Sequence, residues 1–252
     1  MPNEFIRAAP IGAEPPLVQG VVLALFGSWR PDSGQTLAVA ERVRVALMRA
    51  SGSRVPWQVS GKDQQGRPRL GHEHLYILPF ASGLVSGEGR VDRVLLWARG
   101  GLDPRTAAVV EHLSDHGGWI RVGRNPPLRL ERLGGAAPSQ VLGPARVWHS
   151  VSGFAPPRHT KRRRGSIQDP PEQQLARLCE AVLGQTPRAV EICPGFAERW
   201  SGAMEVRSKD TASRTGIRCS GWTLRFDQPV AGPLALGYGA HFGLGRFEAG
   251  AQ

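Results

Sequence analysis

The order of apolar patterns along residues 17–132 constrains the fold more than any other feature of the sequence. A nearly unbroken apolar run predicts a buried strand over 17–26, and apolar residues at helical spacing predict a helix over 36–50. A second helix is expected over 104–115, with Asp103 as its cap. Further strands are expected over 54–60, 74–80, 91–98, 119–122 and 128–132. Strand, helix, strands, helix and strand is the order of a ferredoxin-like fold, which RNA-recognition domains share.

A second unit of the same kind is expected after a linker of small residues over 133–143. A helix is predicted over 172–183. The strands of this unit are expected over 145–152, 188–193, 203–209, 222–226 and in a last segment that ends near Phe247. The sequence thus predicts an α+β fold of two tandem ferredoxin-like (RRM-like) units, residues 1–133 and 144–252, with a C-terminal glycine-rich loop over 232–246.

Basic residues outnumber acidic ones, 32 against 21, which gives a net charge of +11 and a sequence pI of about 11.0. Only Lys62, Lys161 and Lys209 are lysine, so almost all of this charge is carried by arginine. The arginine fork binds phosphate in a bidentate manner and stacks on bases. A polyanionic partner such as nucleic acid is therefore expected.

The cysteines and apolar segments argue against a secreted or membrane protein. Cys179, Cys193 and Cys219 show neither metal-ligand spacing nor a disulfide framework, which is typical of reduced thiols in the cytoplasm. No apolar run is long enough to cross a membrane, and the N-terminus does not resemble a signal peptide. The expectation is a cytoplasmic protein without cofactor, metal or membrane partner.

The glycine-rich loop contains two pairs of glycines at two-residue spacing, in a segment that otherwise resembles a strand. These are Gly237 with Gly239 and Gly243 with Gly245. Glycine weakens a strand, so its use here needs a reason. We expect these glycines to let the backbone approach the phosphate chain of RNA closely.

A basic arm is expected over 156–171, before the second-unit helix. Prolines and a glycine flank its charges, which favours an exposed, irregular excursion. Its basic side chains would bind phosphates in a salt-dependent manner without reading sequence. The residues predicted to bind RNA here are Arg158, His159, Lys161, Arg162, Arg163 and Arg164.

His72 and His74 form a His-x-His pair, which places both side chains on one face if the segment is a strand. A zinc site would need further ligands that the neighbourhood does not supply. A structural role and RNA contact remain the two alternatives for the pair. No carboxylate pair and no complete phosphate-binding loop stand out, so a nuclease of this sequence would work without metal. RNA permits this, because its own 2′-hydroxyl can attack the neighbouring phosphate.

Several stretches together resemble the CRISPR-associated endoribonucleases that cut precursor CRISPR RNA within its repeats. The glycine segment 237–245 is similar to the glycine-rich loop of that group of RNA-binding (RAMP) proteins. The stretches 60–63, 71–74, 94–98, 143–150 and 157–163 look like the RNA-processing half of the fused type I-U (I-G) protein. The length of the chain also resembles the stand-alone type IV processing nuclease.

The resemblance implies a metal-independent endoribonuclease that binds CRISPR repeat hairpins and cleaves them through the 2′-hydroxyl to yield mature crRNA. It also implies that the protein stays bound in an effector complex with other Cas subunits. The alternative that it leaves open is a non-catalytic crRNA-binding scaffold subunit. A more remote alternative is an arginine-rich ribosome-associated protein.

The expected catalytic residues depart from the family pattern. The family usually has a histidine after the first strand, whereas residues 1–71 contain no histidine. Arginine is therefore the favoured residue type, at Arg30, Arg42 and Arg246, where it would stabilise the phosphorane. His241 is the alternative, as are His72 and His74.

Overall fold

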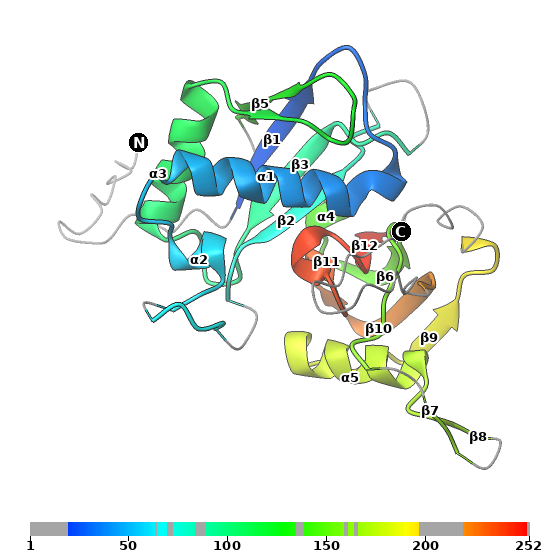
Figure 1. The fold of residues 1–252 in the computed structure, drawn as a ribbon. Helices are drawn as coiled ribbons and strands as arrows, with labels where there is room; N and C mark the ends of the chain where they lie inside the picture. The colour runs from blue at the N-terminus through cyan, green and yellow to red at the C-terminus, as the bar shows by residue number, and fades with distance from the viewer. Residues whose placement is uncertain are drawn as a thin grey trace, which may run out of the picture.

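The computed structural model describes residues 20–63, 65–69, 73–83, 89–134, 139–158, 161–163, 166–196 and 219–250. Within these residues, two five-stranded antiparallel sheets belong to the two halves of the chain (Figure 1). The first half forms β1 (Gly20–Phe26), η1 (Ser33–Gln35), α1 (Thr36–Ala50), α2 (Trp57–Ser60), β2 (Tyr76–Phe80), β3 (Arg93–Trp97), α3 (Pro104–Asp115), β4 (Trp119–Ile120) and β5 (Leu128–Leu133). The second forms α4 (Ser139–Leu142), β6 (Ala145–Ser150), β7 (Lys161–Arg163), β8 (Ser166–Gln168), α5 (Pro171–Leu183), β9 (Ala189–Ile192), β10 (Trp222–Val230), β11 (Leu234–Ala235), η2 (Ala240–Phe242) and β12 (Arg246–Ala249).

The first sheet has the strand order of a ferredoxin-like fold. Its order is β2-β3-β1-β5-β4, in which β5 is the last of the four ferredoxin-like strands and the short β4 is added at the edge. Leu23, Leu25 and Val94 point from the sheet into a core shared with α1 and α3. Both helices begin and end where the sequence predicts. The cap is also confirmed, since Asp103 Oδ1 accepts a 2.8 Å hydrogen bond from the backbone N–H of Thr106.

The expected strand over 54–60 is wrong, because the chain forms the helical turn α2 there. The reason is the buried amide of Gln58, which bridges two distant main-chain groups. Its Nε2 donates to the carbonyl of Gly101 at 2.9 Å, and its Oε1 accepts from the N–H of Asp103 at 2.9 Å. A buried amide needs such partners, and these lie about forty residues away in sequence.

The second sheet repeats this strand order but differs in its helices. Its order is β11-β12-β6-β10-β9, so β6, β9, β10 and β12 take the places of the four ferredoxin-like strands. Helix α5 packs on this sheet through Leu175 and Cys179. Between β10 and β12, where a second helix would stand, the chain forms β11 and η2 instead. The glycine-rich segment thus occupies the position of the missing helix.

Two further expectations about the second half need correction. The expected linker contains α4, and its Val141 is only 2% exposed. The basic arm is not irregular throughout, because β7 and β8 pair as a short antiparallel hairpin that projects from the body of the protein (Figure 1). The strand expected over 203–209 lies outside the described residues.

A third cluster of buried residues joins the two halves. The helix-free face of the first sheet contributes Val22, Tyr76, Leu78, Phe80 and Leu95. Val141, Ala235 and Ala240 of the second half pack on them. This part of the first sheet is therefore covered by α4 and by the glycine-rich segment. No helix among the described residues has the length and apolarity that a membrane span requires.

Candidate active site at the junction of the two units

The glycine-rich segment is an irregular turn of left-handed residues and not a strand. Gly237, Gly239, Gly243 and Gly245 all have positive φ angles. A Cβ at Gly245 would lie 1.9 Å from the carbonyl oxygen of Leu236, and one at Gly243 would lie 2.8 Å from Thr36 Cγ2. Close packing within this chain explains these glycines. Contact of this segment with the RNA backbone remains a prediction, but the presence of glycine at these positions no longer supports it.

The segment packs on the first unit beside the N-terminal half of α1. Gly243 fits between Thr36 of α1 and Pro79 of β2. The guanidinium of Arg44 lies 5.8 Å from the centroid of the Phe242 ring. Arg44 also donates hydrogen bonds to the carbonyls of Val59 and Ser60, and its burial lowers its pKa. The turn is thereby fixed against the first sheet.

Two histidines meet at this junction. The ring of His241, from η2, stacks on that of His74 with 3.4 Å between centroids and 18° between planes. The ring of Tyr76 lies 3.9 Å from that of His241. Burial raises the pKa of Tyr76 to about 12, although the charge of Arg99 acts in the opposite direction. The Tyr76 phenol therefore stays protonated at neutral pH and can donate a hydrogen bond.

This arrangement is suited to proton transfer. Positive charges on two stacked imidazoles would repel each other, so the stack disfavours a state in which both rings are protonated. One ring can then accept a proton while the other donates one. Arg99 adds a cation that acts on Tyr76, and its Nη1 donates to the carbonyl of Val182 at the end of α5.

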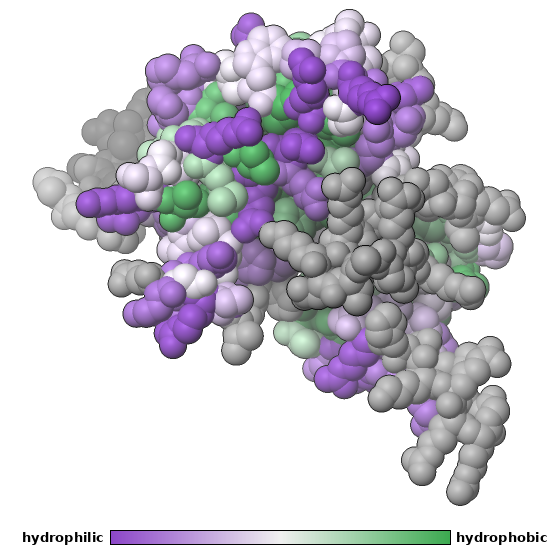
Figure 2. All heavy atoms as spheres, viewed as in Figure 1, coloured by the Kyte–Doolittle hydropathy of each residue, from purple (hydrophilic) through white to green (hydrophobic). Residues whose placement is uncertain are grey.

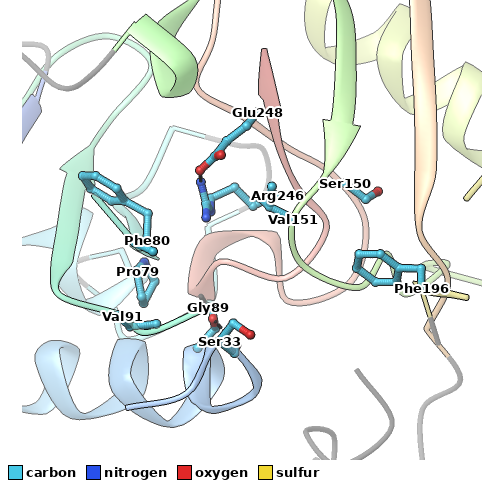
Figure 3. Close-up of a pocket in the computed structure, with 12 residues that line it drawn as sticks. Ser33, Pro79, Phe80, Gly89, Val91, Ser150, Val151, Phe196, Arg246 and Glu248 are labelled. Atoms are coloured by element: carbon cyan, nitrogen blue, oxygen red, sulfur yellow. Dashed lines mark hydrogen bonds and ion pairs between the residues drawn. The ribbon is translucent and has the colours of Figure 1, made fainter. Parts of the chain in front are cut away.

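Arg246 lies in a cavity of about 310 Å³ between the units, shown in Figure 3 with Phe80 and Glu248 on either side. It is only 6% exposed, and its Nη1 donates a 2.6 Å hydrogen bond to Glu248 Oε1. Its backbone N–H donates to Ser152 Oγ at 2.7 Å, and its Nε is buried with no hydrogen-bond partner among the described residues. The adjacent carboxylate neutralises this cation.

Arg30 and Arg42 lie elsewhere. Arg30 Nη1 donates to the carbonyls of Gly27 and Trp29 at 2.8 and 2.9 Å, which stabilises the loop after β1. Arg42 is exposed on α1. Among the described residues, no hydrogen bond, ion pair or ring contact joins Arg30, Arg42 and Arg246 to one another.

The remaining predicted site residues are only partly described. His72, His159 and Arg164 lie outside the described residues. The backbone N–H of Arg158 donates to the Gln174 side chain at 3.1 Å, and Lys161–Arg163 form β7. The described residues contain no group of three or more metal-ligating side chains placed to hold a metal ion.

Sequence reasoning did not single out Tyr76 or Arg99. The signal for Tyr76 was present, since it follows His74 by two residues and so projects on the same side of an extended chain. No local sequence pattern singled out Arg99.

Figure 2 shows hydrophilic side chains over much of the visible surface, with hydrophobic ones in small patches between them.

Comparison with known proteins gives structural matches alone. No family model matches the chain, and no curated protein matches it. The chain is similar to a solved structure of a Cas6 product complex, with 19% identity over 92% of this chain and 98% of that one, and a TM-score of 0.43. It is also similar to a structure of the CRISPR associated protein Cas6, with 11% identity over 90% of this chain and 96% of that one, and a TM-score of 0.44. A third similar structure is that of Csf5, a CRISPR-Cas type IV Cas6 crRNA endonuclease, with 12% identity over 92% of this chain and 98% of that one, and a TM-score of 0.43.

Proposed function

We propose that this protein is a metal-independent endoribonuclease that binds CRISPR repeat hairpins in precursor CRISPR RNA and cleaves them. The observation that carries the proposal is the contact between His74 and His241 at the junction of two ferredoxin-like units. The net charge of +11 supports an RNA substrate. The sequence resemblance to the repeat-cleaving nucleases supports the CRISPR repeat as that substrate.

The proposed reaction needs only proton transfer and charge stabilisation. One imidazole of the pair removes the proton of the 2′-hydroxyl, and the 2′-oxygen forms a bond to the neighbouring phosphorus. The bond from phosphorus to the 5′-oxygen breaks, and the other imidazole gives that oxygen a proton. The products are a 2′,3′-cyclic phosphate and a 5′-hydroxyl. The exposed Arg99 guanidinium would stabilise the charged phosphorane, while the buried Tyr76 ring would hold His241 in place.

This assignment replaces arginine with histidine as the residue that transfers protons. Arginine keeps its proton at neutral pH, so it is a poor acid or base. Arg246 is moreover paired with Glu248, and Arg30 is bound to main-chain carbonyls. In the proposed function, Arg246 holds the junction in shape and Arg30 holds the loop after β1. Arg42 is exposed and would bind a phosphate of the RNA.

A non-catalytic crRNA-binding scaffold subunit is the second candidate function. The observation in its favour is the absence of histidine from residues 1–71, where the resembled family usually has its catalytic one. In either case the crRNA would stay bound to the protein, and the protein would join other Cas subunits in an effector complex.

The experiment that tests the proposed function is incubation of candidate repeat RNAs with the protein in excess EDTA. We expect a single cut per repeat, with a 2′,3′-cyclic phosphate on the upstream fragment. Tight binding of a repeat hairpin with no cut over hours would select the scaffold function. A cut that appears only after Mg²⁺ is restored would contradict the metal-independent reaction.

The β7–β8 hairpin gives a prediction about salt. Replacing Arg162, Arg163 and Arg164 with alanine should weaken RNA binding and reduce the slope of log K against log[salt] by about two to three units, since each phosphate contact contributes about 0.7–0.9. Fluorescence anisotropy between 50 and 200 mM salt measures this slope, a range over which such contacts have large effects.

The matched control removes three arginines elsewhere on the surface. Arg105, Arg146 and Arg188 are exposed on α3, on β6 and before β9. Their triple alanine variant has the same net charge as the hairpin variant, so long-range attraction is equally reduced. An equal change of slope in both variants would show that the hairpin does not contact phosphates.

A further inference from the structure

Three exposed side chains form a row across the end of the first sheet. Phe26 of β1 pairs in register with Arg129 of β5, and Arg129 pairs with Trp119 of β4. Residues paired directly across strands project on the same face. Their sequence neighbours point into the helix-covered core, namely Leu25, Leu128, Leu130 and Ile120. The Cα–Cβ bonds of Phe26, Arg129 and Trp119 therefore leave the sheet on its helix-free face.

The row lies outside the contact between the two units. The residues that bury this face against the second half come from β1, β2 and β3, and Phe26, Arg129 and Trp119 are not among them. Phe26 is 42% exposed and Trp119 is 55% exposed. At the sheet edge, Trp119 also borders a hollow of about 200 Å³ whose other walls come from α1 and α3 on the helix-covered side.

The charges around the row favour a polyanion. Arg129 is half exposed and forms an ion pair with Glu131, two residues along the same strand. An exposed ion pair of this kind contributes little to stability, so a phosphate can compete for the guanidinium. Arg121 and Arg124 are exposed just beyond Trp119 and add two further positive charges.

The spacing of the row fits single-stranded RNA. Neighbouring strands lie about 4.8 Å apart, so Phe26 and Trp119 leave the sheet about 10 Å apart with Arg129 between them. An extended single strand can place one base on each ring and the phosphate between them at the guanidinium. A protein partner would need about 1,000 Å² of buried surface, which two separated rings do not offer.

We propose that Phe26, Arg129 and Trp119 form a stacking platform for two bases of single-stranded RNA, separate from the histidine junction. The platform would hold the single-stranded flank of the repeat hairpin, and in that respect it rests on the proposed function. Aromatic rings stack on any base, so the platform would bind the flank with little sequence preference.

The test compares two RNAs and two protein variants by fluorescence anisotropy. The RNAs are a repeat hairpin alone and the same hairpin with its single-stranded flank, both 2′-deoxy at the cut site so that cleavage plays no part. The double variant Phe26→Ala, Trp119→Ala should bind the flanked RNA at least about 5-fold more weakly, which is the smallest effect expected from losing the stacking of one base. It should bind the bare hairpin as the unaltered protein does.

The matched control is the double variant Ile192→Ala, Arg225→Ala. It removes an exposed apolar side chain and the arginine of an exposed ion pair from the second sheet. It should bind both RNAs like the unaltered protein. Equal weakening for both RNAs, or a control as weak as the platform variant, would overturn the platform.

A second measurement keeps the protein unaltered and replaces the flank bases with abasic sites. Loss of the flank's contribution to affinity is expected. Unchanged affinity would overturn the platform even if the double variant failed to fold. If the protein never cleaves the RNA but binds it more tightly when the flank bases are present, the platform stands and the nuclease proposal is refuted. Cleavage without any dependence on flank bases would do the reverse.

Discussion

Replacing His241 with alanine is expected to slow cleavage of repeat RNA by about 10²–10⁴-fold, the usual contribution of a positioned acid or base. The imidazole lies in contact with His74 and beside Tyr76, and in the proposed function it passes a proton to or from the RNA. Binding of the RNA should change little, because the positive charges that attract it remain. Single-turnover cleavage and anisotropy measure the two effects separately.

The matched control for this variant is His112→Ala. His112 also contacts a second histidine, His116, with 4.2 Å between ring centroids, but on α3 and away from the junction. The His112→Ala protein should cleave repeat RNA at the same rate as the unaltered protein. The double variant of His74 and His241 should be little slower than either single one, because residues that act as a unit are not additive. A His241→Ala protein that cleaves as fast as His112→Ala would contradict the proposed chemistry.

Replacing Gly245 with alanine is expected to destabilise the protein by about 3 kcal/mol or more and to lower Tm by roughly 6–12 °C. The residue has a φ of +56°, which disfavours a side chain, and its Cβ would lie 1.9 Å from the Leu236 carbonyl oxygen. That oxygen belongs to the backbone, so the segment itself must move. Thermal unfolding followed by circular dichroism measures the effect.

Gly100→Ala is the matched control for Gly245→Ala. A Cβ at Gly100 meets no atom within 4 Å, and its backbone lies outside the left-handed region. This variant should unfold close to the unaltered protein. Equal melting temperatures of the two variants would show that the glycine-rich segment is not fixed as described.

The fold could largely be predicted because local signals and the ferredoxin-like order agree. The helix over 36–50 has its apolar stripe, and the helix over 104–115 has Asp103 as a cap. The backbone conformation of the glycine-rich loop could not be predicted, because its φ angles depend on packing against Leu236 and Thr36, which the two-residue glycine spacing does not reveal. The turn α2 depends on distant partners of Gln58 in the same way.

The candidate site was harder to predict than the fold. His74 and His241 were each alternatives in the sequence, but their contact arises only when the glycine-rich segment packs on β2. Arg246 looked suited to bind phosphate, and Glu248, two residues on, was the local sign that its charge is neutralised. The row of Phe26, Arg129 and Trp119 follows from strand register, which no local pattern gives.

Attack by the 2′-hydroxyl can be tested with one substitution in the RNA. The 2′-hydroxyl at the mapped cut site is replaced with hydrogen, and the RNA is incubated with the unaltered protein in EDTA beside an RNA that is 2′-deoxy at the next nucleotide. The first RNA should be bound and stay intact, whereas the second should be cut as usual. Cleavage of the first RNA at the normal rate would contradict attack by the 2′-hydroxyl.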